Sequence, residues 1–230
     1  MRDERSERYF DKFRFSRASV PSSYSSVDYG NVSPVKSQGQ CGSCCAFATL
    51  AVVETCFKKL TGVFGDYSEQ ELLDCGGQYA NGCDGAGIYS YPQYIKDNQR
   101  RLASETTYPY KAQTWFRCPR EKPFNQGAKV TDYRYTDRGD EETLKKLVYK
   151  HGAVIISILA DGYFTQYGGG ILDGCSRNGE SRGKYTNHAV AVVGYGRERG
   201  TDFWLIKYSW GEWGGEKGYI RVKRGCGLVE

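Results

Sequence analysis

The sequence lacks most features that mark membrane, nucleic-acid-binding or repeat proteins. Its 230 residues contain no apolar run near the ~20 residues that a membrane-spanning helix needs. The net charge is only +5, and the basic residues are scattered in short runs such as Arg100-Arg101, which excludes an extended nucleic-acid surface. Internal repeats and low-complexity segments are absent as well. The composition, 39% hydrophobic and 26% charged, is therefore that of an ordinary globular protein.

The N-terminus lacks the apolar stretch of a signal peptide, since it reads MRDERSERYFDKFRF. Residues 1–19 alternate charged and aromatic side chains and contain no glycine, so we interpret them as a leader or propeptide remnant, with the mature body starting near Val20. The chain nevertheless contains nine cysteines, an unusual load for a reducing compartment. This indicates a protein of the secretory pathway, secreted or lysosomal/vacuolar. Asn31-Val32-Ser33 is a glycosylation sequon, which predicts a glycan on Asn31.

Histidine is scarce, with two residues, whereas three cysteines crowd into the segment QGQCGSCCAFA at 38–48. Zinc binding by Cys41 and Cys44 would need a second close cysteine pair or a nearby histidine, and neither is present. A dithiol redox motif would follow a strand, but the residues before Cys41 are typical of a loop. No metal or cofactor is expected. Structural disulfides cannot account for every cysteine, because nine is an odd number and at least one thiol must stay unpaired.

A nucleophilic role for Cys44 has a physical basis. Apolar residues recur at helical spacing after Ser43, a suitable N-cap residue, so Cys44 should be the first residue of a buried helix that ends near Gly62. A helix N-terminus lowers a thiol pKa, and the free N–H of Cys44 can bind an oxyanion. His188, at the mouth of an apolar strand, is a better base than His151, which ends a predicted helix.

The remaining pattern predicts an α+β fold, helical first and strand-rich after about residue 112. Further helices are expected over residues 69–74, 88–98 and 140–150, and strands over 128–135, 154–159, 189–193, 203–206 and 219–222.

At this point the residues indicate a family. QGQCGSCCAF resembles the nucleophile segment of papain-like cysteine peptidases, which usually reads QGxCGSCWAF. Six further segments are similar to landmarks of that family, in the family's order and across residues 20–230: SEQELLDC (68–75), GCDGAG (82–87), TYPY (107–110), NHAVAVVGYG (187–196), SWGEWGGEKGYIRVKRG (209–225) and CGL (226–228).

The resemblance implies a helical half over residues 20–112 and a β-barrel-like half over 113–230, with the active-site cleft between them. It also selects one of the 15 ways to pair six cysteines. The implied disulfides are Cys41–Cys83, Cys75–Cys118 and Cys175–Cys226. Cys44, Cys45 and Cys56 then stay free; the last two lie ~16 Å apart along one helix, too far to bond.

The resemblance also implies roles for individual residues. Cys44 matches the nucleophile, His188 the base that forms the thiolate–imidazolium pair, and Gln38 the amide that binds the developing oxyanion. Around them, the implied substrate-binding residues are Gly85, Ala86, Ala189 and Trp210, of which Gly85 pairs its backbone with substrate and Trp210 shields the histidine from water. Trp213 matches a second tryptophan near the leaving-group side.

The sequence departs from the family pattern at three functional positions. Tyr208 replaces the asparagine that orients the histidine ring, and its rigid phenol is not expected to reproduce that hydrogen bond. Cys45 replaces a tryptophan, and we hypothesise that the bulky Tyr208 compensates for this loss by contact with Cys45. Ala86 replaces a glycine. We therefore expect weakened rather than absent catalysis.

The function implied is that of a cysteine endopeptidase acting through an acyl-enzyme, because no loop near residues 110–130 has the form of an exopeptidase insertion. The alternative is a papain-fold protein that binds peptides or proteins with little turnover, which Tyr208 favours. Expected partners are polypeptide substrates, the protein's own propeptide and cystatin-type inhibitors, and the expected state is a monomer.

Overall fold

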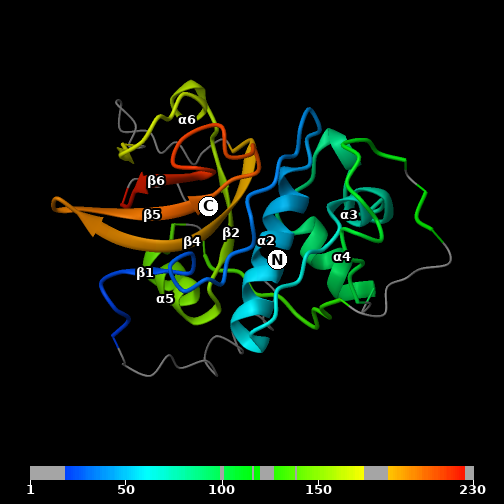
Figure 1. Cartoon of the computed structure of the whole chain (residues 1–230), viewed down its shortest axis with the longest axis horizontal. Helices are drawn as coiled ribbons and strands as arrows, with labels where there is room; N and C mark the ends of the chain where they lie inside the picture. The colour runs from blue at the N-terminus through cyan, green and yellow to red at the C-terminus, as the bar shows by residue number, and fades with distance from the viewer. Residues whose placement is uncertain are drawn as a thin grey trace.

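The computed structural model of the chain describes residues 19–98, 101–115, 117–119, 127–137, 139–173 and 186–225. Helices α2, α3 and α4 gather on one side, and the sheet with helices α5 and α6 lies on the other (Figure 1). Helix α2 stands between the two sides and makes contacts with both α3 and β4. The α+β class and the division into a helical and a sheet-rich side are therefore confirmed, while a boundary near residue 112 stays a prediction.

The helical side is built on α2, whose sequence is apolar around most of its circumference. Its elements are α2 (Cys44–Thr61), α3 (Glu69–Cys75), the short 3-10 helix η1 (Gly82–Asp84) and α4 (Ser90–Asn98). Helix α2 ends as predicted at Gly62, whose φ of 76° is a left-handed conformation that glycine adopts without strain. At the start of α3, the Ser68 hydroxyl accepts a hydrogen bond from the Glu71 N–H and caps the helix.

The sheet side consists of six strands and two helices. These are β1 (Tyr24–Ser25), α5 (Glu141–His151), β2 (Val154–Ile158), α6 (Gly162–Thr165), β3 (Ile171–Leu172), β4 (His188–Glu198), β5 (Thr201–Lys207) and β6 (Tyr219–Lys223). The strand order is β1-β4-β5-β6-β3, and β2 shares with β1 the edge of β4 that faces away from β5. Most pairs are antiparallel; β3 and β6 run parallel.

Two expectations about the sheet need correction. Within the described residues the sheet is open, so the β-barrel-like description is too strong; its end strands, β1 and β3, contain two residues each and do not meet. The strand expected over residues 128–135 is not formed, and only an isolated bridge joins Arg101 to Lys129. The alternating pattern there arises because Ala128 and Val130 pack individually against the helical core.

Two of the three implied disulfides are present. Cys41 bonds to Cys83 and Cys75 to Cys118, while Cys44, Cys45 and Cys56 are free thiols. The third implied disulfide, Cys175–Cys226, lies outside the described residues. The first bond joins the loop before α2 to η1, and the second joins the end of α3 to residue 118.

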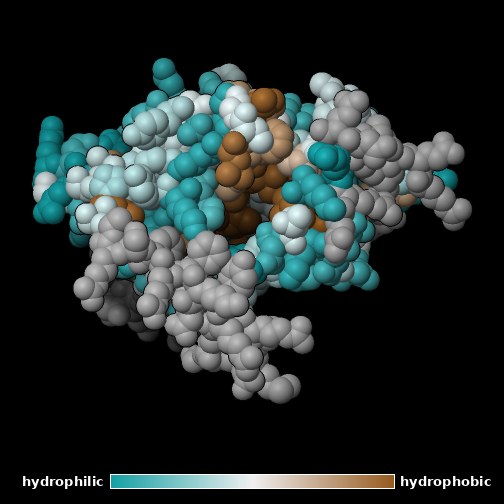
Figure 2. All heavy atoms as spheres, turned by 90° about the horizontal axis from the view of Figure 1, so that it is seen from below, coloured by the Kyte–Doolittle hydropathy of each residue, from teal (hydrophilic) through white to brown (hydrophobic). Residues whose placement is uncertain are grey.

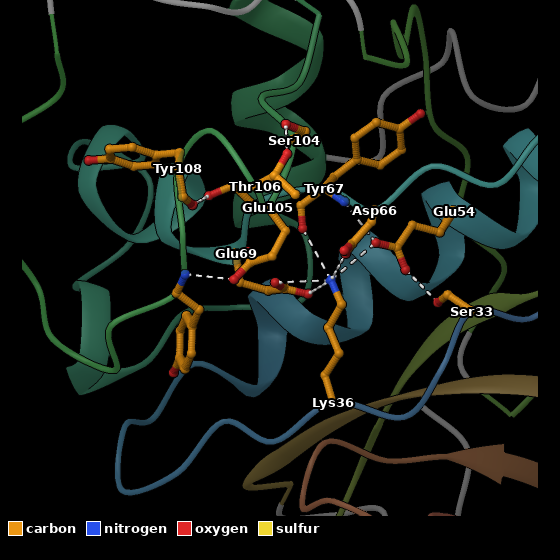
Figure 3. Close-up of polar contacts among 12 residues, drawn as sticks. Ser33, Lys36, Glu54, Asp66, Tyr67, Glu69, Ser104, Glu105, Thr106 and Tyr108 are labelled. Atoms are coloured by element: carbon orange, nitrogen blue, oxygen red, sulfur yellow. Dashed lines mark hydrogen bonds and ion pairs between the residues drawn. The ribbon is translucent and has the colours of Figure 1, made fainter.

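A cluster of charges around Lys36 includes buried carboxylates of α2 and α3 (Figure 3), and Ser33 links it to the sheet. The Lys36 ammonium donates hydrogen bonds to Glu54 on α2 at 3.3 Å and to Glu69 on α3 at 2.9 Å. Ser33 donates to the other oxygen of Glu54 at 2.5 Å and accepts from Lys207, at the end of β5, at 3.0 Å. Because each buried charge has partners in another element, the cluster fixes the two sides relative to one another.

Replacing Ser33 by alanine should lower the free energy of unfolding by about 1–3 kcal/mol, because Glu54 and Lys207 would each lose a buried partner. Chemical denaturation of the purified protein measures this. Ser22→Ala, at an exposed serine, is the control and should change the free energy by less than about 0.5 kcal/mol. Equal stability of the two variants would contradict the proposed importance of the cluster.

The face opposite the Cys44 end of α2 is apolar along its middle, between polar flanks (Figure 2). Leu60, Val63 and Phe64, at and just beyond the end of α2, are among the large apolar side chains exposed to solvent. No helix in the described part of the chain combines the length and apolar character needed to cross a membrane.

Candidate active site

The first turn of α2 places Cys44 at the junction of the two sides. Cys44 is the first residue of the helix and is partly buried, and the loop before it is held tightly. The Gly42 N–H donates to the Cys83 carbonyl at 2.8 Å, and a Cβ at Gly42 would lie 2.4 Å from that oxygen. Only glycine fits at position 42, because a side chain there would collide with the Cys83 carbonyl. The backbone of the CGSC segment can therefore lie against residues 82–85.

Ser43 occupies the N-cap position of α2, as predicted, but its side chain does not cap the helix. Its hydroxyl instead forms a hydrogen bond with the Tyr110 hydroxyl at 2.6 Å. The first N–H groups of a helix have no partner within the helix. Without a side-chain cap, the Cys44 end of α2 retains donors that can bind developing negative charge.

Gln38 lies beside this helix end and is held in one orientation. Its side-chain oxygen accepts a hydrogen bond from the Ser209 hydroxyl at 2.6 Å, and its Nε2 donates to the Cys41 carbonyl at 2.8 Å. Its backbone N–H also donates to the Ser209 carbonyl at 2.8 Å. A primary amide has two N–H donors, so one remains for an oxyanion. The Gln38 amide is thus held against the loop that leads into α2, and its role in binding an oxyanion stays a prediction.

His188 reaches Cys44 from the opposite side of the junction. It is the first residue of β4, where its register opposite Ile158 of β2 fixes its backbone. The side chain is buried, and its ring lies 4.6 Å from the Trp210 ring at an interplanar angle of 30°. Phe164 packs edge-on against Trp210 at 5.6 Å. Trp210 therefore packs on the buried imidazole and Phe164 packs on Trp210, while the role of Trp210 in keeping water from the histidine stays a prediction.

The surroundings of Cys44 stabilise its thiolate. A hydrogen bond with Cys45 is the largest cause, followed by a hydrogen bond with His188, a backbone hydrogen bond with Ala189 and the charge of His188; together they outweigh burial and lower the pKa of Cys44 to about 4. An ordinary thiol has a pKa of 9.0. Burial raises the pKa of Cys56 to about 11. Of the free thiols, Cys44 has the chemistry of a nucleophile.

The rate at which iodoacetamide alkylates Cys44 should rise with pH through an acid limb near pH 4, because the thiolate forms there rather than near pH 9. Peptide mapping by mass spectrometry measures the rate at each pH. Cys56 provides the internal control, since its raised pKa predicts slow labelling over the same range. An acid limb for Cys44 near that of an ordinary thiol would contradict the ion pair.

Tyr208 does not orient His188. Its hydroxyl donates to the Gly214 carbonyl, and its ring lies 5.5 Å from the Trp210 ring. The Nε2 atom of His188 is buried and has no hydrogen-bond partner among the described residues. The expectation that Tyr208 fails to replace the family asparagine is thus in line with the geometry, and apart from its hydrogen bond with Cys44 the ring is held by packing against Trp210.

The hypothesis that Tyr208 compensates for Cys45 by contact is not supported. Cys45 packs in the core of the helical side with Leu50, Leu72 and Tyr91, whereas Tyr208 packs in the core of the sheet. Tyr91 is almost completely buried beside the small Cys45. Aromatic residues of the helical side, rather than Tyr208, surround the position where the family has tryptophan.

Three of the implied substrate-binding residues, Ala86, Ala189 and Trp210, lie near Cys44 or His188. Ala189 is buried, and Ala86 and Cys44 pack against the same cluster of side chains. Gly85 has a φ of 104° and a ψ of 174°, a conformation that requires glycine. Trp213, by contrast, is 99% exposed. Whether these residues bind substrate stays a prediction, as does the glycan on Asn31, a partly exposed residue two positions before the buried Ser33.

Comparison with known proteins agrees with this geometry. The family described as papain family cysteine protease matches residues 20–229. The chain belongs to the papain family. It is 39% identical to cysteine protease XCP2 of Arabidopsis thaliana over 232 residues, which cover 100% of this chain and 62% of that protein. It is 38% identical to a cathepsin L-like proteinase of Fasciola hepatica, covering 91% of this chain and 64% of that protein. The papain-family chain thus spans just under two thirds of the length of these two curated relatives.

Solved structures of papain-family proteases show the same fold. Bromelain of Ananas comosus, in complex with the E64 inhibitor, superposes with a TM-score of 0.80 at 35% identity, covering 91% of this chain and 96% of that one. Digestive procathepsin L2 of Tenebrio molitor superposes with a TM-score of 0.84 at 34% identity, covering 93% of this chain and 67% of that one.

Sequence reasoning missed several residues that support the site. Ser209 orients Gln38, and Tyr110 bonds to both Ser43 and the Gln38 carbonyl. Both residues lie in segments that resemble family landmarks, SWGEWGG and TYPY. Neither segment by itself predicts these hydrogen bonds. Among the described residues, no group of three or more histidine, cysteine and acidic side chains could hold a metal ion.

Proposed function

We propose that this papain-family chain is a cysteine endopeptidase whose Cys44 thiolate attacks the peptide carbonyl. His188 protonates the leaving amine, and the Gln38 amide with the Cys44 N–H stabilises the oxyanion. The observation that carries the proposal is the position of Cys44 at an uncapped helix end against His188, where its pKa falls to about 4. Water then hydrolyses the acyl-enzyme, with His188 acting as the base.

The proposal extends to partners and compartment. Polypeptides are the proposed substrates, and Gly85, Ala86 and Ala189 the residues that line their binding site. The papain-family neighbours include a bromelain complex with E64 and a procathepsin, which supports an epoxide inhibitor and a propeptide as ligands of the cleft. Two disulfides support maturation in the secretory pathway, followed by secretion or delivery to a lysosome or vacuole. We also propose that the protein is a monomer and that cystatin-type proteins inhibit it.

The test is covalent labelling with E64, the epoxide inhibitor named in the bromelain complex, followed by mass spectrometry. A stoichiometric adduct on Cys44 under reducing, mildly acidic conditions, with turnover of a fluorogenic peptide, is the expected result. An adduct on Cys45 would show that the nucleophile was misassigned. An adduct on Cys44 without turnover would instead support the alternative of a binding protein, for which the structural reason is that His188 Nε2 has no hydrogen-bond partner within the described part of the chain.

A further inference from the structure

The C-terminal ends of α2 and α5 lie side by side, at the opposite end of α2 from Cys44. The Lys59 ammonium on α2 donates a hydrogen bond to the Tyr149 carbonyl on α5 at 2.6 Å, and the Cys56 thiol donates to the His151 carbonyl at 3.2 Å. Helix α2 contains 18 residues, so at 1.5 Å per residue its last turn lies about 26 Å from Cys44. The two helix ends therefore form a surface that is separate from the candidate active site.

Three apolar side chains of this surface project into solvent. Leu60 is 84% exposed, Val63 is 60% exposed and Phe64 is 49% exposed. They lie on either side of Gly62, whose left-handed conformation ends α2. On the face seen in Figure 2, apolar side chains gather in the middle between polar flanks. Single exposed apolar residues are ordinary, whereas several that lie together indicate an interaction surface.

Basic and aromatic side chains surround the three apolar ones. The Lys58 ammonium lies 4.3 Å from the centre of the Phe64 ring. The Lys59 ammonium lies 4.8 Å from the centre of the Tyr24 ring, on which the Tyr29 ring is stacked at 5.5 Å. Tyr29 is itself 70% exposed. The surface thus combines exposed aliphatic groups, ammonium groups and phenol rings.

Acidic side chains contribute little to this surface. Asp66, which follows it in the chain, pairs with Lys36 at 2.8 Å. Asp28 is exposed near its edge. On the basic side of the balance, Lys150 and His151 at the end of α5 are both exposed. The charge of the surface is therefore predominantly positive, which suits an anionic partner.

A structural role accounts for the lysines but not for the apolar side chains. Lys58 and Lys59 donate hydrogen bonds to backbone carbonyls near the ends of α2 and α5, as basic residues often do at helix C-termini. Leu60 and Val63 have no such use at their exposure. A protein partner would need a matching pocket for each projecting side chain, whereas a fluid bilayer accepts them without a matching shape. Aliphatic side chains among lysines and aromatic rings are the composition that binds anionic lipid surfaces.

We propose that the protein docks on an anionic phospholipid membrane through a basic-apolar surface made of Lys58, Lys59, Leu60, Val63, Phe64 and Tyr149. Leu60 and Val63 enter the headgroup region, and the two lysines face the anionic headgroups. Binding of this kind is non-covalent and needs no membrane-spanning helix. Because Cys44 lies at the other end of α2, the docked protein keeps its cleft toward the solution. The proposal goes beyond the proposed function and does not depend on it.

The experiment is co-sedimentation of the full chain with vesicles, either of phosphatidylcholine alone or with about 30% phosphatidylserine as the anionic lipid. Leu60→Ser/Val63→Ser removes the apolar contact, and Lys58→Gln removes one charge. The matched controls are Tyr163→Ser, at a 57% exposed side chain on α6, and Arg199→Gln, at the exposed turn between β4 and β5. Thermal melting verifies that each variant is folded.

The parent should bind the anionic vesicles at least about tenfold more tightly than the neutral ones, and added salt should weaken this binding. Leu60→Ser/Val63→Ser should lower the affinity about tenfold, because two apolar side chains are lost from the contact. Lys58→Gln should lower it about fivefold, the usual contribution of one lysine near an anionic surface. Tyr163→Ser and Arg199→Gln should match the parent.

Four results would overturn the proposal. One is a parent that does not sediment with anionic vesicles, and another is equal affinity of the parent and Leu60→Ser/Val63→Ser. Dimerisation of the parent that this double variant abolishes, without vesicle binding, would show that a second copy covers the surface. Retention on immobilised polyglutamate that depends on Lys58, again without vesicle binding, would indicate an acidic polypeptide instead.

Failure of the proposed function would be seen separately. Blocking Cys44 with E64 should leave vesicle binding unchanged, because the surface and the thiol lie at opposite ends of α2. Bound and free protein should also cleave a soluble fluorogenic peptide at the same rate. A chain that binds vesicles but cleaves no peptide would therefore contradict only the protease, and a vesicle-bound chain that loses its cleavage would contradict the proposed orientation.

Discussion

Replacing Tyr208 by asparagine should raise kcat/KM on peptide substrates about 100-fold, because an orienting group is worth orders of magnitude in related triads. The buried His188 Nε2 has no partner among the described residues, and an asparagine at position 208 offers a carbonyl oxygen that can accept its proton. Since the ring would then be held in one orientation, kcat should account for most of the gain. Steady-state kinetics of the parent and the variant measure it.

Tyr208→Phe is the matched control for this gain. It removes the hydroxyl that donates to Gly214 but adds no acceptor for the histidine, so it should show no increase in kcat. The loss of ring volume in Tyr208→Asn should cost about 3 kcal/mol of stability, because Tyr208 packs in the core of the sheet. A folded Tyr208→Asn protein with parental kcat would show that ring packing by Trp210 already orients His188 sufficiently.

Replacing Cys44 by serine should lower kcat about 10⁵-fold and abolish the E64 adduct, because effects of this size follow removal of a nucleophile. A serine hydroxyl is not ionised by the environment that lowers the pKa of Cys44 to about 4. Intact-mass spectrometry and the fluorogenic assay detect both losses.

The neighbouring cysteine provides the control for this loss. Cys45→Ser keeps the Cys44 nucleophile and should retain both the adduct and measurable turnover. If Cys44→Ser retained the adduct and Cys45→Ser lost it, the nucleophile would be Cys45. If both variants kept full activity, the protease proposal itself would fail.

The parts of the molecule that could be predicted from the sequence are those in which the residues present allow a single structural or chemical role. Helix α2 was predicted because its apolar spacing and terminal Gly62 allow no other element, and His188 was selected because only two histidines exist. The free state of Cys44, Cys45 and Cys56 and two disulfides were implied by the family resemblance and are found. The long strand β4 was placed, although its length was underestimated because Gly194 and Gly196 interrupt the apolar pattern.

The rest depended on contacts between distant segments, which local patterns do not carry. Residues 128–135 alternate as a strand does, yet form only an isolated bridge, because no neighbouring edge is offered to them. The sequence of helix α2 does not predict that Glu54 is buried. The partners of Glu54, Ser33 and Lys36, lie in an irregular segment before the helix. The Cys45–Ala86 hydrogen bond likewise joins a helix to a loop 41 residues away.

The groups that lower the pKa of Cys44 lie at very different distances from it along the chain. Cys45 is its neighbour in the chain, but His188 and the Ala189 backbone reach it only when β4 docks against α2. Before that docking Cys44 lacks its contacts with His188 and the Ala189 backbone, so its pKa lies above the value of about 4 that it has in the folded protein. The full acidity of Cys44 is therefore a property of the docked structure, because it depends on the contact between β4 and α2.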